Sequence, residues 1–155
     1  MKINENEFVT SSIRDKCLKF WNSNDYSNIA TINNIETEWP SGTLCIINEN
    51  IICVGGKNPK GFYLINITNH QLIKNILWPQ RIYGIYKCFD GLFLCSIINE
   101  NGSHSLVKYK YENQDMKKIV EREIIHSSNI FTCIELNDRT VASGSKDKLI
   151  KLWRN

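Results

Sequence analysis

The last segment of the chain repeats the first one without a gap. Residues 141–153 (VASGSKDKLIKLW) lie over residues 9–21 (VTSSIRDKCLKFW), and the offset is 132 residues, three periods of 44. Steps of 44 from Trp21, Val9 and Met1 reach large apolar residues or cysteines in every case: Ile65, Tyr109 and Trp153; Cys53, Ile97 and Val141; Cys45, Phe89 and Cys133. An internal period of this length is typical of repeat architectures, in which each repeat is one small structural unit.

Each period contains short runs of β-branched and aromatic residues separated by Asn, Asp, Gly, Ser and Lys, and helical spacing is not sustained anywhere. We therefore predict an all-β single domain over residues 1–155. Its repeats are 1–33 (partial), 34–77, 78–123 and 124–155 (partial). One complete unit has strands at 41–48, 51–56, 62–67 and 71–77, read as an outer strand, an inner strand and two middle strands. Lys108 stands at a position that is apolar in the other repeats, which predicts that the register of the third unit is shifted by one residue.

The last repeat carries a motif as well as a period. Residues 126–134 (HSSNIFTCI), 141–147 (VASGSKD) and 149–153 (LIKLW) resemble a WD repeat closely. The resemblance implies an incomplete β-propeller of about three and a half four-stranded blades. It also implies a hydrogen-bonded network within the blade, formed by His126, Ser143, Asp147 and Trp153.

The first repeat keeps Ser11, Asp15 and Trp21 at the same spacing, while its His would precede Met1. The chain departs from the family pattern elsewhere. Asn22 and Arg154 stand where the family has Asp after Trp, and the middle repeats have Ile65 and Tyr109 at the Trp position.

The motif has a structural and a catalytic interpretation. A buried imidazole needs partners on both nitrogens and a buried indole N–H needs an acceptor, so the network explains His126 and Asp147 without chemistry. The alternative is a catalytic pair. Because no nucleophile, phosphate-loop or paired-carboxylate motif accompanies them, we expect no enzyme and no cofactor. His70 and His104 lie among Asn and Ser without a third ligand, so we expect no metal site.

The six cysteines include no Cys-x-x-Cys pair, and five lie in apolar runs. Free cysteine packs as a small hydrophobic residue, so we expect core positions, with metal or redox chemistry as the alternative.

Two Trp-Pro pairs precede predicted inner strands, namely Trp39-Pro40 and Trp78-Pro79, the second followed by Arg81. Trp is enriched in interface hot spots, so these residues are candidates for partner binding. The alternative is that both rings pack over the blade edge where the missing His would lie.

The formal net charge is +3, without a clustered basic stripe, which disfavours nucleic acid as a partner. No apolar run is long enough for a membrane span, and the polar N-terminus lacks a signal peptide's apolar centre, so we expect an intracellular, cytoplasmic protein without a membrane partner. The predicted function is a non-catalytic protein–protein interaction scaffold. The alternative is a half-propeller subunit completed by another chain, and a propeller enzyme is the third class. Because closure protects edge strands, we also expect a homo-oligomer or completion by a missing chain segment.

Overall fold

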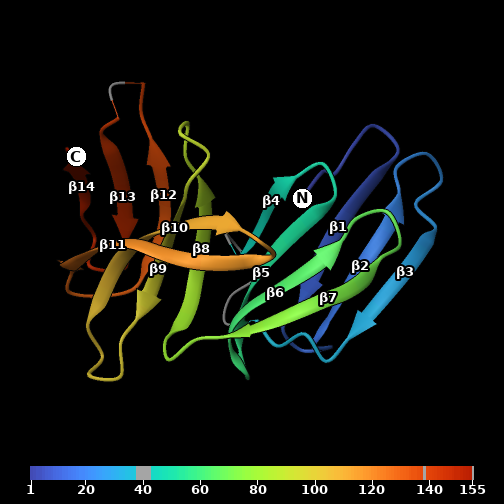
Figure 1. Ribbon diagram of the computed structural model, residues 1–155, viewed down its shortest axis with the longest axis horizontal. Helices are drawn as coiled ribbons and strands as arrows, with labels where there is room; N and C mark the ends of the chain where they lie inside the picture. Colours follow the sequence, from blue (N-terminus) through green and yellow to red (C-terminus); the bar gives the residue numbers. More distant parts are fainter. Residues whose placement is uncertain (38–42, 138, 155) are drawn as a thin grey trace.

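The computed structural model describes residues 1–37, 43–137 and 139–154 of the chain. Within these ranges the regular structure is β, as predicted, in four antiparallel sheets. No helix among the described residues is long and apolar enough to cross a membrane. Figure 1 shows the sheets following one another across the molecule in chain order, with the first and last at opposite ends.

The strands of each sheet also follow chain order. Sheet 1 contains β1 (Glu7–Ser12), β2 (Cys17–Asn22) and β3 (Asn28–Asn33). Sheet 2 contains β4 (Leu44–Asn48), β5 (Ile51–Lys57), β6 (Lys60–Asn66) and β7 (Gln71–Leu77). Sheet 3 contains β8 (Arg81–Lys87), β9 (Phe93–Ile98), β10 (His104–Glu112) and β11 (Asp115–His126). Sheet 4 contains β12 (Ile130–Glu135), β13 (Val141–Ser145) and β14 (Ile150–Trp153).

The predicted position of strands within a unit was wrong. In a complete sheet the second and third strands are central, and the first and fourth are edges. The first strands of sheets 2, 3 and 4 lie together, because β8 contacts both β4 and β12. The first strand is therefore the inner one, and the fourth, not the first, is the outer one.

The sheets pack face to face around three apolar cores. One core joins sheets 1 and 2 and includes Phe20 and Ile65, a second joins sheets 2 and 3 and includes Leu64 and Tyr109, and a third joins sheets 3 and 4 and includes Leu106. We call the face toward the preceding sheet the front face and the opposite one the rear face. Sheets 2 and 3 are covered on both faces, which explains the continuous burial of their central strands.

The 44-residue period holds for one column and fails for another. Ile65, Tyr109 and Trp153 pack in the cores on the front faces of their sheets, in agreement with the period. The 44-residue series that starts at Val9 does not keep one face. Val9 and Cys53 pack on rear faces, whereas Ile97 and Val141 pack on front faces. Phe89, from the third column, is 72% exposed outside the strands. Since a one-residue shift moves a strand residue to the opposite face, these columns do not align equivalent positions.

Lys108 shows where the third unit deviates. Its neighbour Tyr109 keeps the front face, and β10 pairs with β9 in uninterrupted register from His104 to Tyr109. The register shift lies instead in the ladder to β11, between Lys108 and Tyr109. The slip predicted at Lys108 therefore affects the outer strand and leaves the central pair in register.

Candidate functional site: a hydrogen-bonded network and the hairpin end

The four residues expected to form a network in the last repeat lie within hydrogen-bonding distance of one another. His126, at the end of β11, places Nδ1 2.7 Å from Asp147 Oδ2 and Nε2 2.8 Å from Ser143 Oγ. Trp153 Nε1 donates to the same Ser143 oxygen over 3.0 Å. All hydrogen-bonding positions are used when Nδ1–H donates to Asp147 and the Ser143 hydroxyl donates to Nε2. The network fastens the end of sheet 3 to the second and third strands of sheet 4.

Asp147 also shapes the turn between β13 and β14. Its carboxylate accepts from the backbone N–H of Leu149 at 3.0 Å and of Ser127 at 3.2 Å. Burial raises the pKa of the carboxyl group, but the hydrogen bonds from His126 and these two amides outweigh it and lower the pKa to about 2. Asp147 is thus ionised at neutral pH, and its lone pairs are taken by donors of the protein itself.

The corresponding position in the first repeat is occupied by a different residue from the one predicted. Trp21 Nε1 donates to Thr10 Oγ1 at 2.9 Å, and the expectation for Ser11 was wrong. Trp21 pairs across the ladder with Phe8, whereas Trp153 pairs with Val141, so the first hairpin contains one residue more than the last. The ungapped alignment conceals this insertion. Asp15 lies exposed in the turn, where its amide donates to Ser12 Oγ.

The middle repeats replace the network by apolar packing. Trp153, Ile65 and Tyr109 occupy the Trp position of their repeats, and each pairs with a residue of the preceding strand. The residue two positions after that pairing partner is Ser143 in sheet 4, Val54 in sheet 2 and Cys95 in sheet 3. Val54 and Cys95 are fully buried. Trp78 directly follows the fourth strand of sheet 2, and His126 ends the fourth strand of sheet 3, so the two residues occupy similar places. The Trp78 ring packs edge-on against the Tyr109 ring, with centroids 5.5 Å apart. The structure therefore supports the packing interpretation of Trp78 over the hot-spot one.

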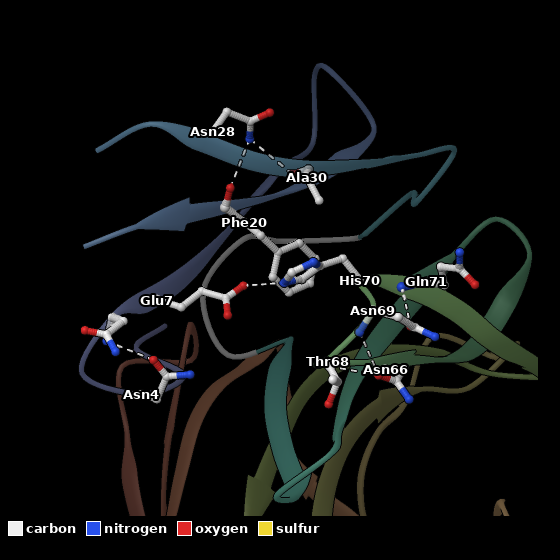
Figure 2. Close-up of polar contacts among 11 residues, drawn as sticks. Asn4, Glu7, Phe20, Asn28, Ala30, Asn66, Thr68, Asn69, His70 and Gln71 are labelled. Carbon is white, nitrogen blue, oxygen red and sulfur yellow. Dashed lines mark hydrogen bonds and ion pairs between the residues drawn. The ribbon is translucent and has the colours of Figure 1, made fainter. Parts of the chain in front are cut away.

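A second histidine contact, which the sequence did not reveal, joins sheets 1 and 2. His70 Nε2 lies 2.6 Å from Glu7 Oε1, and both side chains are mostly buried. The imidazole also packs on the Phe20 ring, with centroids 4.6 Å apart. Figure 2 shows the Glu7 carboxylate directed at the imidazole, with Phe20 beside it. These residues are 63 positions apart in sequence, and no motif connects them.

Cys88, Asp90 and Glu135 form a cluster with potential metal ligands between sheets 3 and 4. Its donors are already engaged within the protein. Lys108 Nζ lies 2.8 Å from Asp90 Oδ2, and the Phe89 amide donates to Glu135 at 2.6 Å. Burial, aided by the nearby Glu135, raises the pKa of the Cys88 thiol to about 12, so the thiol stays protonated. The cluster is therefore a satisfied polar contact between two sheets.

All six cysteines are free and buried, as expected for core positions. Burial raises the pKa of Cys45 to about 11 and of Cys133 to about 12, and it raises the pKa values of Cys53 and Cys95 well above the usual range of a thiol. Protonated, enclosed thiols are poor nucleophiles and poor metal ligands.

Two further partner-binding candidates, Pro79 and Arg81, lie at one end of the stack. We call it the hairpin end, because it carries the β1–β2, β5–β6, β9–β10 and β13–β14 hairpins, at 12–17, 57–60, 98–104 and 145–150; the β5–β6 and β9–β10 hairpins reach the lower edge of Figure 1. Pro79 and Arg81 are exposed there. Trp39 and Pro40 lie outside the described residues. A hollow of about 420 Å³ opens beside Arg81, lined by Lys60, Ile98, Asn99, Glu100 and Gly102.

The hairpin end is rich in basic side chains. Three of its four hairpins carry a basic pair, and Arg81 adds another cation: Arg14 and Lys16, Lys57 and Lys60, Lys146 and Lys148. Part of this charge is compensated locally. Lys16 Nζ lies 2.7 Å from Glu36 Oε1, and Lys60 Nζ lies 3.9 Å from Glu100 Oε1 across the hollow.

Comparison with known proteins identifies the fold. No protein-family model matches the sequence, and no curated protein matches it. Among solved structures, a chain of the mitotic checkpoint complex is similar over 97% of this chain and 46% of its own, with a TM-score of 0.75 and 12% identity. The extracellular domain of a putative hybrid two-component system from B. thetaiotaomicron is similar over 95% of this chain and 20% of its own, with a TM-score of 0.60 and 13% identity.

The chain thus spans less than half of each of these solved chains. At such low identity the likeness concerns architecture alone. Together with the four antiparallel sheets stacked in chain order, it shows that this chain has an all-β fold of the propeller type.

Proposed function

We propose that this chain is a non-catalytic, WD-repeat-type binding module that holds another protein at its hairpin end. The observation that carries the proposal is the hollow beside Arg81, where loops of sheets 2 and 3 meet on a rigid support. Lys60 and Arg81 present cations there, which fits a partner segment with acidic side chains.

The support beneath this hollow is well packed. Trp78 holds the connection into β8 through its ring contact with Tyr109 and through its amide, which donates to Lys60 O at 3.0 Å. Pro79, directly after it, is exposed. Rigid loops lose little conformational freedom on binding, which favours affinity for a protein partner.

The proposal that the chain is not an enzyme is supported by the state of its histidine network. The His126 side chain is fully enclosed, and both ring nitrogens have partners within 2.8 Å. A general base must reach a substrate proton, and an enclosed imidazole with both nitrogens engaged does not. If the network is of the WD-repeat type, the same hydrogen bonds have a structural role, which is to hold the end of sheet 3 against sheet 4.

Site-specific photocrosslinking tests the proposal. A photoreactive amino acid replaces Arg81 in one variant and Asn69 in another, and both are expressed in the native host. Asn69 is the control because it lies in the turn between β6 and β7, at the end opposite to the hairpin end. We expect a discrete protein adduct from position 81, identified by mass spectrometry, and none from position 69.

Charge reversal at the hollow provides the second arm. Lys60→Glu combined with Glu100→Lys keeps the net charge but exchanges the two positions, and it should reduce the adduct from a reporter placed at Pro79. Equal adducts from both ends of the molecule, or the absence of any adduct at position 81, would contradict the proposal.

A further inference from the structure

The β9–β10 hairpin carries the only asparagine of the sequence that is followed by glycine, Asn101. Asn101 and Gly102 are both exposed, and they lie at the hairpin end, beside the hollow that Gly102 lines. Gly102 has φ +79°, and a Cβ built on it would meet no other atom within 4 Å. A backbone amide without a side chain can approach neighbouring atoms more closely than the amide of a larger residue.

The side-chain carbonyl of Asn101 is polarised by two hydrogen-bond donors. The Ser103 backbone N–H donates to Asn101 Oδ1 over 3.0 Å, and the Ser103 hydroxyl donates to the same oxygen over 2.7 Å. Ser103 Oγ in turn accepts a hydrogen bond from Asn99 Nδ2 over 2.9 Å, which strengthens the hydroxyl as a donor. Two donors on one carbonyl oxygen stabilise negative charge that develops on it, as in an oxyanion hole.

Asn66 provides a matched comparison within the molecule. Its Oδ1 also accepts two hydrogen bonds, from the Thr68 amide at 2.8 Å and from the Asn69 amide at 3.0 Å. The residue that follows Asn66 is Ile67, which is β-branched and buried. The two asparagines therefore share a polarised carbonyl and differ in how closely the following amide nitrogen can approach the side-chain carbon.

We propose that Asn101 is a site of spontaneous deamidation. The Gly102 N–H donates to the Asn99 carbonyl at 3.0 Å, and this hydrogen bond must open first. The Gly102 nitrogen then attacks Asn101 Cγ, the new C–N bond closes a cyclic imide, and the Cγ–Nδ2 bond breaks. Nδ2 takes up the proton that the Gly102 nitrogen lost and leaves as ammonia. Water then opens the imide at either carbonyl, which leaves aspartate or isoaspartate at position 101 without any oxidation or reduction.

The new carboxylate changes the charge of the hollow. Among the residues that line it, Lys60 and Arg81 are cationic and Glu100 is anionic. A carboxylate at position 101, between two lining residues, brings the anionic charges to the number of the cationic ones. Because an acidic segment is attracted by an excess of positive charge, deamidation weakens its binding; this consequence rests on the proposed function. The reaction is one-way, so it limits how long one molecule holds its partner.

Peptide mass spectrometry of the purified chain, incubated at neutral pH, tests the modification without any partner. We expect the acid form to accumulate at least about tenfold faster at position 101 than at Asn66, with isoaspartate among the products, because only the Gly102 nitrogen is free to reach the side-chain carbon. Equal rates at the two positions would overturn the proposal. So would aspartate without isoaspartate, because direct hydrolysis of the side-chain amide gives aspartate alone.

Two variants test the roles of the neighbouring residues. Gly102→Ala keeps the asparagine and should slow the reaction about tenfold, since a Cβ hinders the approach of the nitrogen. Ser103→Ala removes one donor to Asn101 Oδ1 and should slow it about threefold. Urea denaturation shows whether both variants are folded. A rate in Ser103→Ala equal to or above that of the wild type would contradict the role of the hydroxyl.

Photocrosslinking from Pro79 tests the effect on binding. Asn101→Asp carries the charge of the aspartate product and should reduce the adduct about threefold. Asn101→Ser is the neutral control, because its hydroxyl can accept in a similar turn, and its adduct should equal that of the wild type. Equal adducts from the two variants would contradict the effect on binding. A wild-type chain without an adduct at position 81 would overturn the proposed function and this effect together, whereas the rates at position 101 decide the modification independently.

Discussion

At the scale of single residues, Ser143 is the centre of the best-defined polar group in the molecule. One hydroxyl oxygen serves both the His126 imidazole and the Trp153 indole, in a position that is almost fully buried. The resemblance of the last repeat to a WD repeat implied this group, and three of its members, Ser143, Asp147 and Trp153, lie in one hairpin. His126 was added by the resemblance of the whole repeat.

Removal of the hydroxyl should be costly. Ser143→Ala leaves the Trp153 N–H and His126 Nε2 without a partner in a buried site, and we expect the free energy of unfolding to fall by about 1–3 kcal/mol. Urea denaturation measures the change. Ser11→Ala is the control: Trp21 bonds to Thr10 and not to Ser11, so the loss should be within about 0.5 kcal/mol. Equal losses in the two variants would contradict the register described for the first hairpin.

Asp147 should make stability depend on acid pH. Its pKa in the folded protein is lowered to about 2, below the ordinary aspartate value of 3.8. The stabilisation from a lowered pKa is complete above the unfolded-state pKa and is lost as the pH falls through the folded-state pKa. We therefore expect unfolding free energy to decrease between about pH 4 and about pH 2 in the wild type. In Asp147→Asn this component of the pH dependence should be absent, and thermal unfolding at a series of pH values will show whether the two profiles differ there.

At the scale of elements, the length of each hairpin determined which strands the 44-residue alignment of the repeats placed correctly. The strands β2, β6, β10 and β14 keep a 44-residue step from Trp21 to Trp153. Their cross-strand partners are Phe8, Ile52, Phe93 and Val141, which are separated by 44, 41 and 48 residues. Insertions in one hairpin and deletions in another cancel over the whole chain except for one residue, the extra residue of the first hairpin. A constant period therefore described one strand of each sheet and assigned several residues of the neighbouring strand to the wrong face.

Glycine at the start of β6 is a requirement of the β5–β6 hairpin. Gly61 has φ +134°, and a Cβ there would collide with the Ile76 carbonyl oxygen of the adjacent strand. Gly61→Ala should lower the free energy of unfolding by about 2 kcal/mol or more, because both backbone strain and the collision oppose it. Gly102→Ala, at φ +79° in open space, is the control and should cost about 1 kcal/mol. Similar denaturation midpoints for the two variants would show that β6 and β7 can separate without loss.

At the scale of the whole molecule, the contacts that hold the sheets together come from residues far apart in the sequence. Glu7 contacts His70, Tyr86 donates its hydroxyl proton to the Phe131 carbonyl, and the Phe89 amide donates to Glu135. These polar contacts lie beside apolar cores that pair the rear face of one sheet with the front face of the next. Only this packing order shows that the rear face of sheet 4 differs from the others, because its Ile134, Ile150 and Leu152 side chains remain exposed.

The sequence by itself determined the all-β class, because that class depends on alternation within short runs of chain, and the resemblance to a WD repeat supplied the members of the last network. The tertiary structure decided which face each strand residue occupies, which oxygen accepts the hydrogen bond from the Trp21 indole N–H, and that the partly buried Trp78 ring packs against Tyr109. It also decided which apolar residues remain exposed. These properties depend on hairpin lengths and on the stacking of one sheet on another, and a one-residue change in either moves a side chain to the opposite face.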